Sequence, residues 1–276
     1  MNLATALRQG VELLEKENVP AARLAAEVLL AHALRCERVY LYAHPDRELA
    51  DVEQLHYGRY LNERLNGKPT QYITGRQEFY GREFRVTADV FIPRPETELV
   101  VEAALRHAAG ARRVLDVGTG SGALAVTLAK EWPAALVLAC DLSRPAIEVA
   151  RANARAHDAG IRFFRADLLD ACGDARFDLI VSNPPYVPEE EFAGLPREVR
   201  EYEPPLALLG GPRGLACYRR LFDGAARVLR PGGWLIVEMG YRSRADVESL
   251  AGPKWSSRAV EPDLAGFDRV LALRRA

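Results

Sequence analysis

Apolar side chains recur every three or four positions through the first 75 residues, beginning with Leu3, Leu7, Val11 and Leu14. This period places the apolar residues on one face of a helix, which is then buried against neighbouring helices. Proline interrupts the pattern within residues 44–46, and glycine and proline interrupt it within residues 66–69, so helices are expected to end there. We therefore expect residues 1–75 to form a small all-helical domain.

The helical period gives way to aromatic and β-branched residues between residues 76 and 92. Phe79 and Tyr80 precede Gly81, and Phe84 follows it. Runs of this kind around a glycine are typical of a short hairpin. We expect residues 76–92 to be a β-hairpin linker between two domains.

Strand-like and helix-like segments alternate from residue 113 onward. Apolar runs rich in β-branched residues, which indicate buried strands, lie at 114–117, 136–141, 161–166, 177–182 and 234–239. Helical segments lie between them at 123–131, 144–155 and 218–229. This alternation is typical of a parallel sheet covered by helices on both faces. Two last strand-like runs, joined by a short turn, are expected to pair antiparallel at the sheet edge, at 255–260 and 267–273.

The pattern therefore predicts an α/β domain over residues 93–276, with a mostly parallel sheet and an antiparallel edge hairpin. This is the arrangement of the Rossmann-like class I methyltransferases.

The charges of the chain are balanced, with 37 Lys and Arg against 38 Asp and Glu. A protein that binds a phosphate backbone usually carries a basic surplus, so we expect no stable binding to nucleic acid. No uncharged apolar stretch approaches the roughly 18 residues that a membrane-spanning helix needs. We therefore expect a cytoplasmic protein without membrane contact. The four cysteines and five histidines show neither disulfide nor metal-ligand spacing, so we expect no metal.

A glycine-rich loop follows the first strand of the α/β domain, with the sequence Asp116-Val117-Gly118-Thr119-Gly120-Ser121-Gly122. Ligands bind at this position in open α/β sheets, and glycines let the backbone approach them closely. The loop alone also satisfies the looser fingerprint of dinucleotide-binding proteins, and Asp141 lies at about the right offset for ribose hydroxyls in either case.

Asp116 favours S-adenosylmethionine over a dinucleotide. A carboxylate before the glycines can pair with the amino group of the methionine moiety, whereas it would repel a pyrophosphate. Asp167 ends the third strand, so it is a candidate for the adenine side of the pocket.

A second motif, Asn183-Pro184-Pro185-Tyr186, follows the buried strand 177–182 and is expected at the same sheet edge as the glycine loop. The prolines have no N–H and restrict the backbone, so Asn183 and the Pro184 carbonyl are held rigidly. An amide nitrogen is a poor nucleophile that must be oriented, and these two oxygens can each accept one N–H of a substrate NH₂ group. Tyr186 can stack on the planar group. We interpret the chain as a methyltransferase acting on a planar amide or amino nitrogen.

The sequence resembles the release-factor glutamine methyltransferase family, also called PrmC or HemK, over essentially its whole length. The resemblance rests on Ile92-Pro93-Arg94-Pro95-Glu96-Thr97-Glu98, the glycine loop, Val181-Ser182-Asn183-Pro184-Pro185-Tyr186, and Tyr202-Glu203-Pro204 with Ala207-Leu208. It implies a helical substrate-docking domain, a hinge and a catalytic domain. It also implies a substrate, the glutamine of the Gly-Gly-Gln motif of class 1 peptide-chain release factors.

On this resemblance the contacts to S-adenosylmethionine fall on Gly118 to Gly122, Asp141, the step Asp167-Leu168 and Asn183. Residues 183–186 hold the glutamine. Family members commonly have an aromatic residue at the position of Leu168, so only apolar packing is expected there.

Three other readings of the motifs remain. Methyltransferases that act on exocyclic amino groups of nucleic-acid bases carry a similar Asn-Pro-Pro-Tyr motif. The glycine loop alone would allow a nicotinamide-dependent oxidoreductase, and the fold alone would allow a noncatalytic binding module. The intact residues 183–186 argue against the last two. The long connection at 187–212 is expected to be a functional lid.

Overall fold

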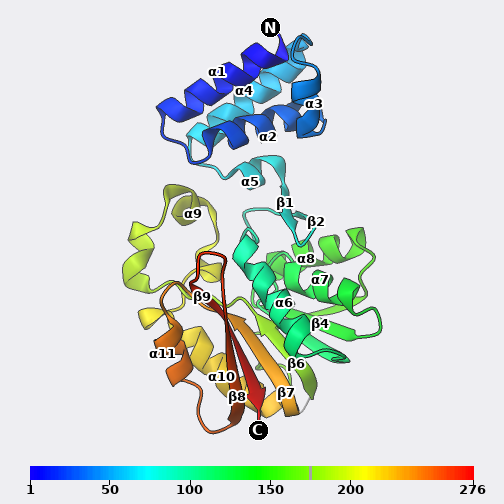
Figure 1. Cartoon of the computed structure of the whole chain (residues 1–276), viewed down its shortest axis with the longest axis vertical. Helices are drawn as coiled ribbons and strands as arrows, with labels where there is room; N and C mark the ends of the chain where they lie inside the picture. Colours follow the sequence, from blue (N-terminus) through cyan, green and yellow to red (C-terminus); the bar gives the residue numbers. More distant parts are fainter. Residues whose placement is uncertain (174–175) are drawn as a thin grey trace. The chain divides into compact units, whose positions relative to one another are not determined.

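The computed structural model describes residues 1–173 and 176–276. The chain forms two compact units, each shown in Figure 1. The helical unit consists of Met1–Arg76 together with Pro196–Tyr202. The sheet unit consists of Gln77–Leu195 together with Glu203–Ala276.

The helical unit is built on the apolar stripes of the amino-terminal sequence. Leu14, Leu29 and Leu30 are fully buried between its helices. The Asn2 side chain caps the first helix by accepting a hydrogen bond from the Thr5 N–H at 3.0 Å. The helices are α1 (Leu3–Lys16), α2 (Ala22–Leu34), α3 (Arg38–Ala43), α4 (Asp51–Leu65), α5 (Thr70–Thr74) and α9 (Arg197–Tyr202).

Helix α9 comes from far along the chain and completes the helical unit. The Arg64 side chain, only 6% exposed, forms an ion pair with Glu198 of α9. Tyr202 Oη donates to the carbonyl of Asn66 at 2.9 Å. The periodicity of residues 1–75 gives no sign of this partner, because helix patterns report which face is buried and not what covers it.

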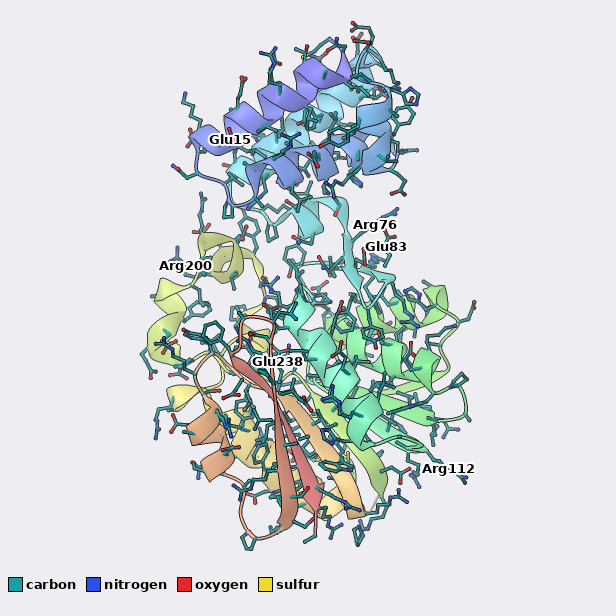
Figure 2. The ribbon with its side chains drawn as sticks, viewed as in Figure 1. Glu15, Arg76, Glu83, Arg112, Arg200 and Glu238 are labelled. Atoms are coloured by element: carbon teal, nitrogen blue, oxygen red, sulfur yellow. The ribbon has the colours of Figure 1, made fainter. Side chains whose placement is uncertain are left out.

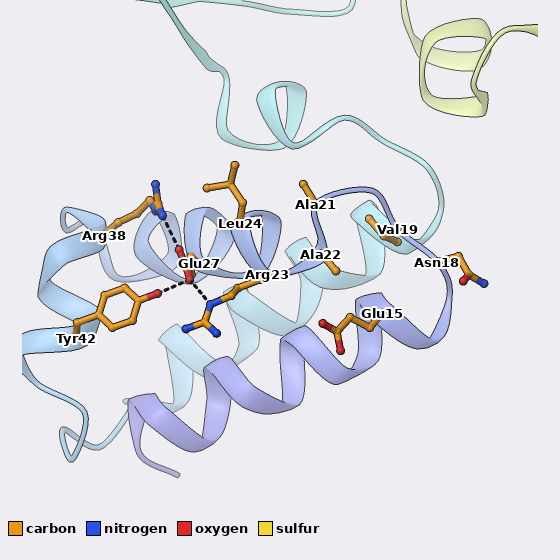
Figure 3. Close-up of a pocket in the computed structure, with 10 residues that line it drawn as sticks. All are labelled: Glu15, Asn18, Val19, Ala21, Ala22, Arg23, Leu24, Glu27, Arg38 and Tyr42. Atoms are coloured by element: carbon orange, nitrogen blue, oxygen red, sulfur yellow. Dashed lines mark hydrogen bonds and ion pairs between the residues drawn. The ribbon is translucent and has the colours of Figure 1, made fainter.

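A hollow of about 750 Å³ on the helical unit surrounds a buried carboxylate, Glu27 (Figure 3). The Glu27 carboxylate accepts hydrogen bonds from Arg38 at 2.6 Å, from Arg23 at 3.1 Å and from Tyr42. Burial opposes ionisation of Glu27, but these three donors together lower its pKa. The hollow is therefore lined by a satisfied ion-pair cluster that ties α2 to α3.

The expected hairpin is present, and it is shorter than residues 76–92. Strands β1 (Arg76–Phe79) and β2 (Arg82–Arg85) form it. Phe84 is buried in the core of the sheet unit. Asn153 fixes β2 through two backbone contacts to Arg85, accepting from its N–H at 2.8 Å and donating to its carbonyl at 2.9 Å.

The seven-stranded sheet has the order β5-β4-β3-β6-β7-β9-β8. Strands β3 to β7 are parallel, and β9 pairs antiparallel with both β7 and β8. The α/β fold with an antiparallel edge hairpin is thereby confirmed. The strands are β3 (Arg113–Val117), β4 (Leu136–Asp141), β5 (Ile161–Arg165), β6 (Phe177–Ser182), β7 (Leu229–Glu238), β8 (Trp255–Pro262) and β9 (Asp268–Arg275).

Helices cover both faces of the sheet because side chains alternate along each strand. Val114 faces the core formed with α6 (Glu98–His107) and α7 (Ala123–Glu131), whereas Leu115 faces the core formed with α10 (Ala216–Val228). Figure 1 shows these helices on opposite faces of the sheet, with α8 (Arg144–Ala156) beside α7 and α11 (Arg244–Ser249) beside α10. In residues 1–173 and 176–276, no helix is both long and apolar enough to cross a membrane.

Gly122→Ala is expected to lower the free energy of unfolding by about 1 to 3 kcal/mol, because Gly122 has a left-handed φ of +85° that disfavours any side chain. A Cβ there would also lie 3.1 Å from the Ala150 Cβ of α8. Urea unfolding followed by circular dichroism would measure the change. Gly160→Ala is the matched control in the same unit, since a Cβ at Gly160 meets open space. Equal stability of the two variants would contradict this account.

Candidate functional site

The two motifs meet because β3 and β6 are neighbours in the sheet and run parallel. Val117 pairs with Ser182, so the glycine loop and residues 183–186 leave the sheet at the same edge. The Ser182 hydroxyl, fully buried, donates to the Val117 carbonyl at 2.7 Å and ties the two strand ends together. The chain continues to one side of β3 through β4 and to the other side through β6, and ligands of open α/β sheets bind at such a reversal.

The glycine loop holds its shape with its own backbone. Gly118 and Thr119 both donate to the Cys140 carbonyl at 2.9 Å, and Gly122 donates to the Thr119 carbonyl at 2.8 Å. The N–H of Gly120 donates to Asp141 Oδ2 at 2.9 Å. These four donors are engaged within the protein, which leaves a pyrophosphate without the backbone cradle that a dinucleotide site provides. The side chain of Ser121 is buried, and its carbonyl accepts from Asn153 at 2.8 Å.

Asp116 presents a buried carboxylate oxygen without a partner. Its Oδ2 accepts from the Thr119 hydroxyl at 2.7 Å and from the Ala125 N–H at 3.2 Å. Its Oδ1 has no hydrogen-bond partner among the described residues, and the residue is only 1% exposed. Burial, aided by nearby Asp141, raises the pKa of Asp116 to about 7 against the lowering effect of the two donors. An unsatisfied buried carboxylate oxygen fits a cationic group such as the ammonium of S-adenosylmethionine.

Asp141 stands at the end of β4 with both carboxylate oxygens engaged by the backbone. Oδ2 accepts from Gly120 and Oδ1 accepts from the Ser143 N–H at 2.8 Å. Burial raises its pKa despite these bonds. Each oxygen can accept a further hydrogen bond, so the side chain can receive a pair of ribose hydroxyls.

The Asp167-Leu168 step follows β5. The carboxylate of Asp167 is 44% exposed and forms a two-point ion pair with Arg220 of α10, at 3.0 Å for each oxygen. Leu168 has a left-handed φ of +50°, and its carbonyl accepts from Cys140 Sγ at 3.4 Å. Its side chain packs against the core beside α10. The step therefore lies beside the end of β4, and Arg220 is a neighbour that the strand pattern could not reveal.

Asn183 is held by a residue of another motif. Its Nδ2 donates to the hydroxyl of Thr97 at 3.1 Å. Thr97 ends the 3-10 helix η1 (Pro95–Thr97), which follows the hairpin. Pro184 is buried, whereas Asn183 is half-buried and keeps part of its surface accessible.

Tyr186 is wedged between backbone segments and a carboxylate. Its hydroxyl donates to Glu238 Oε1 at 3.3 Å, and burial raises its pKa. A Cβ at Gly240 would lie 3.0 Å from the tyrosine ring, and one at Gly214 would lie 2.1 Å from the tyrosine carbonyl. Both glycines are therefore required for the close packing that holds Tyr186.

Glu238, labelled in Figure 2, is the site residue that the motifs did not indicate. It ends β7 and is 2% exposed, and its Oε2 accepts from the Thr97 hydroxyl at 2.6 Å. Burial raises its pKa to about 7, although Thr97 and Tyr186 act against this shift. The sequence did contain a signal, because Glu238 is an acidic residue within an apolar strand. The carboxyl end of that strand lies at the sheet edge that carries both motifs.

The long connection after Tyr186 is anchored at both ends. The Val187 N–H donates to the Leu208 carbonyl at 2.8 Å, and the Gly210 N–H donates to the Val187 carbonyl at 2.9 Å. It contains the 3-10 helices η2 (Glu189–Gly194), η3 (Pro205–Ala207) and η4 (Pro212–Gly214) besides α9. Its role as a lid stays a prediction.

Two family models match the chain. The model described as PrmC N-terminal domain matches residues 5–75, and the model described as methyltransferase small domain matches residues 95–194.

Full-length relatives are similar along both units. A protein of Koribacter versatilis (strain Ellin345) named release factor glutamine methyltransferase is 46% identical over 278 residues, covering 100% of this chain and 99% of its own length. A protein of Geobacter sulfurreducens with the same name is 48% identical over 262 residues, covering 95% of this chain and 92% of its own length.

Solved structures share the fold at lower identity. The hMettl16 catalytic domain in complex with a MAT2A 3'UTR hairpin is 17% identical with a TM-score of 0.58, covering 74% of this chain and 79% of that chain. The T. thermophilus 16S rRNA N2 G1207 methyltransferase RsmC, in complex with AdoMet and guanosine, is 22% identical with a TM-score of 0.51, covering 73% and 50%. Because relatives of 46% and 48% identity match along nearly their whole length, the chain belongs to the release factor glutamine methyltransferase family of S-adenosylmethionine-dependent methyltransferases.

Proposed function

We propose that this protein transfers the methyl group of S-adenosylmethionine to the side-chain amide nitrogen of the glutamine in the Gly-Gly-Gln motif of class 1 peptide-chain release factors. The names of its relatives support the substrate. The observation that carries the proposal is the placement of Asn183 beside the glycine loop, with its Nδ2 engaged by Thr97 and its Oδ1 left to accept from a ligand.

Four parts of the site would hold the cofactor. The glycine loop, residues 118–122, would lie against it, and Asp116 Oδ1 would accept from its ammonium group. Asp141 would receive the ribose hydroxyls, because both of its oxygens are fixed by the backbone and keep a free lone pair. Asp167 and Leu168 would border the adenine, with Leu168 contributing only apolar contact. When bound, S-adenosylmethionine supplies an electrophilic methyl group on a sulfonium centre.

Residues 183–186 would align the substrate. Asn183 Oδ1 and the Pro184 carbonyl would each accept one N–H of the glutamine amide, which turns the nitrogen lone pair away from the acceptors. Tyr186 would pack on the planar amide, since its ring is held against the Gly240 backbone. Pro185 completes the rigid turn. These groups act by orientation and bring no strong base to the nitrogen, which loses one proton to solvent as or after it gains the methyl group.

The base-directed alternative rests on the similar motif in nucleic-acid methyltransferases. The solved structures whose names include an RNA are 22% and 17% identical to this chain, which supports the shared fold and not a shared substrate. The balanced charge of the chain also argues against a nucleic-acid channel.

We further propose that residues 1–75 dock the release factor, that residues 76–92 link the domains and that residues 93–276 catalyse transfer. The substrate acts in translation, so the proposed location is the cytoplasm.

The proposed function predicts incorporation of one methyl group at one glutamine. The protein, labelled S-adenosylmethionine and a bacterial class 1 release factor would be incubated and the modified peptide mapped by mass spectrometry. A release factor whose motif glutamine is replaced by asparagine is the control and should stay unlabelled. Label in RNA or DNA that collapses with rising salt, with none in the release factor, would favour the base-directed alternative.

Cofactor binding should release protons near pH 6 through Asp116. Its pKa of about 7 in the free protein means that it is mostly protonated at that pH, and a cationic ammonium favours the ionised form. Affinity should therefore rise with pH toward 7. Calorimetry in two buffers of different ionisation enthalpy should show up to about one proton more released by wild type than by Asp116→Asn. Equal proton release would contradict an ammonium contact at Asp116.

Asn183→Ala should reduce the turnover number about a hundredfold to a thousandfold, because it removes an acceptor that orients the nucleophile. Cofactor affinity should change far less, since Asp116, Asp141 and the glycine loop are intact. Single-turnover methylation with saturating cofactor would measure the first quantity and calorimetry the second. A variant that matches wild type in turnover would reduce Asn183 to a turn residue.

A further inference from the structure

A buried chain of hydrogen bonds connects Glu238 to Asn183. Glu238 Oε2 lies 2.6 Å from the Thr97 hydroxyl oxygen, which lies 3.1 Å from Asn183 Nδ2. Glu238 Oε1 meets the Tyr186 hydroxyl at 3.3 Å. Thr97 is 5% exposed and Glu238 is 2% exposed, so water does not compete for these contacts. The Glu238 carboxylate is thus linked to both polar side chains of the motif, to Tyr186 directly and to Asn183 through Thr97.

The direction of this chain follows from the number of hydrogens available. An ionised carboxylate only accepts, so the single hydrogen of the Thr97 hydroxyl must point to Glu238. The threonine oxygen can then only accept, and of the two ends of the Asn183 amide only the NH₂ end can donate to it. The carbonyl end, Oδ1, is consequently turned away from Thr97 and toward the ligand side.

We infer that Thr97 and Glu238 are positioning residues, which fix the orientation of the Asn183 amide so that Oδ1, and not Nδ2, faces the substrate nitrogen. This inference deepens the proposed function and rests on it for the identity of the substrate. The two ends of an asparagine amide are nearly equal in shape. Without the hydrogen bonds that run from Glu238 through Thr97, the Asn183 amide could turn over, and its NH₂ end would then face a substrate NH₂ group that also donates. The reversed form cannot hold the nucleophile.

The ionisation of Glu238 determines whether the hydrogen bonds among Glu238, Thr97 and Asn183 can run in only one direction. A protonated Glu238 can donate to Thr97, which frees the threonine hydrogen to bind Asn183 Oδ1 and favours the reversed amide. The groups facing Glu238 are Glu96 and Thr97 of the η1 helix, Tyr186, Arg269 of β9 and Tyr218 of α10. Glu96 raises the pKa of Glu238, whereas Thr97, Tyr186 and Arg269 lower it, and burial exceeds them all.

The kinetic test compares Thr97→Val, which keeps the shape and removes the hydroxyl, with Thr97→Ser, which keeps the hydroxyl. At saturating cofactor Thr97→Val should lose about ten- to a hundredfold in kcat, with cofactor affinity unchanged, and Thr97→Ser should retain most of the activity. Thr127→Val is the matched control, because the buried Thr127 hydroxyl has no partner among the described residues. It should behave as wild type.

Two further measurements distinguish a change in the orientation of the Asn183 amide from a general loss of structure. The kcat of wild type should rise as pH passes about 7, and this rise should be absent in Glu238→Gln. In protein without cofactor or substrate, the ¹⁵N side-chain amide signals of Asn183, assigned by their loss in Asn183→Asp, should shift in Thr97→Val and hold in Thr97→Ser.

The inference is overturned if Thr97→Val equals wild type in kcat, if Thr97→Ser falls as far as Thr97→Val, or if the Asn183 signals are the same in wild type and Thr97→Val. A wild-type protein that labels no release-factor glutamine would defeat the proposed function alone. In that case the Asn183 signals still show whether Thr97 orients the Asn183 amide, because they are measured without substrate.

Discussion

The parallel pairing of β3 with β6 is the constraint on which the rest of the site depends. Val117 and Ser182 lie side by side at the ends of these strands, and the buried Ser182 hydroxyl bonds the Val117 carbonyl. Two loops of unrelated sequence therefore leave the sheet at neighbouring points. The roles proposed for these loops, contact with the cofactor for one and orientation of a planar nitrogen for the other, both depend on the adjacency of their strands.

Two buried carboxyl groups lie at this edge of the sheet, and burial shifts the pKa of both in the same direction. Asp116 lies near the end of β3 and Glu238 ends β7, with β6 between these strands, and burial raises the pKa of each carboxyl group to about 7. One oxygen of Asp116 has no partner among the described residues, whereas Glu238 is bonded on both oxygens, to Thr97 and to Tyr186. The same cause, desolvation, would make both proposed roles depend on pH: cofactor binding at Asp116 and amide orientation at Glu238.

Much of this architecture could be predicted from the sequence, because it depends on local periodicity. The order of strands and helices in the sheet unit, the edge hairpin and the two motif loops follow from apolar patterns and from glycine and proline. Partners brought together across the chain could not be predicted that way. Glu238 meets Thr97 across 141 positions, and Arg220 meets Asp167 across 53. The apolar pattern predicts 234–239 only as a strand, and the topology shows that Glu238 at its end meets Thr97.

The helical unit is discontinuous, since α9 reaches it from a point 134 residues beyond the Arg64 that it neutralises. A ribosome synthesises the amino-terminal helices first, long before Glu198 exists. Arg64 then lacks its ion pair with Glu198, and the helical unit lacks α9. The amino-terminal bundle therefore reaches its final state only after β3 to β6 have been translated. Maturation of the first-made unit is coupled to synthesis of the second, and a chain stalled before residue 198 carries an unfinished bundle.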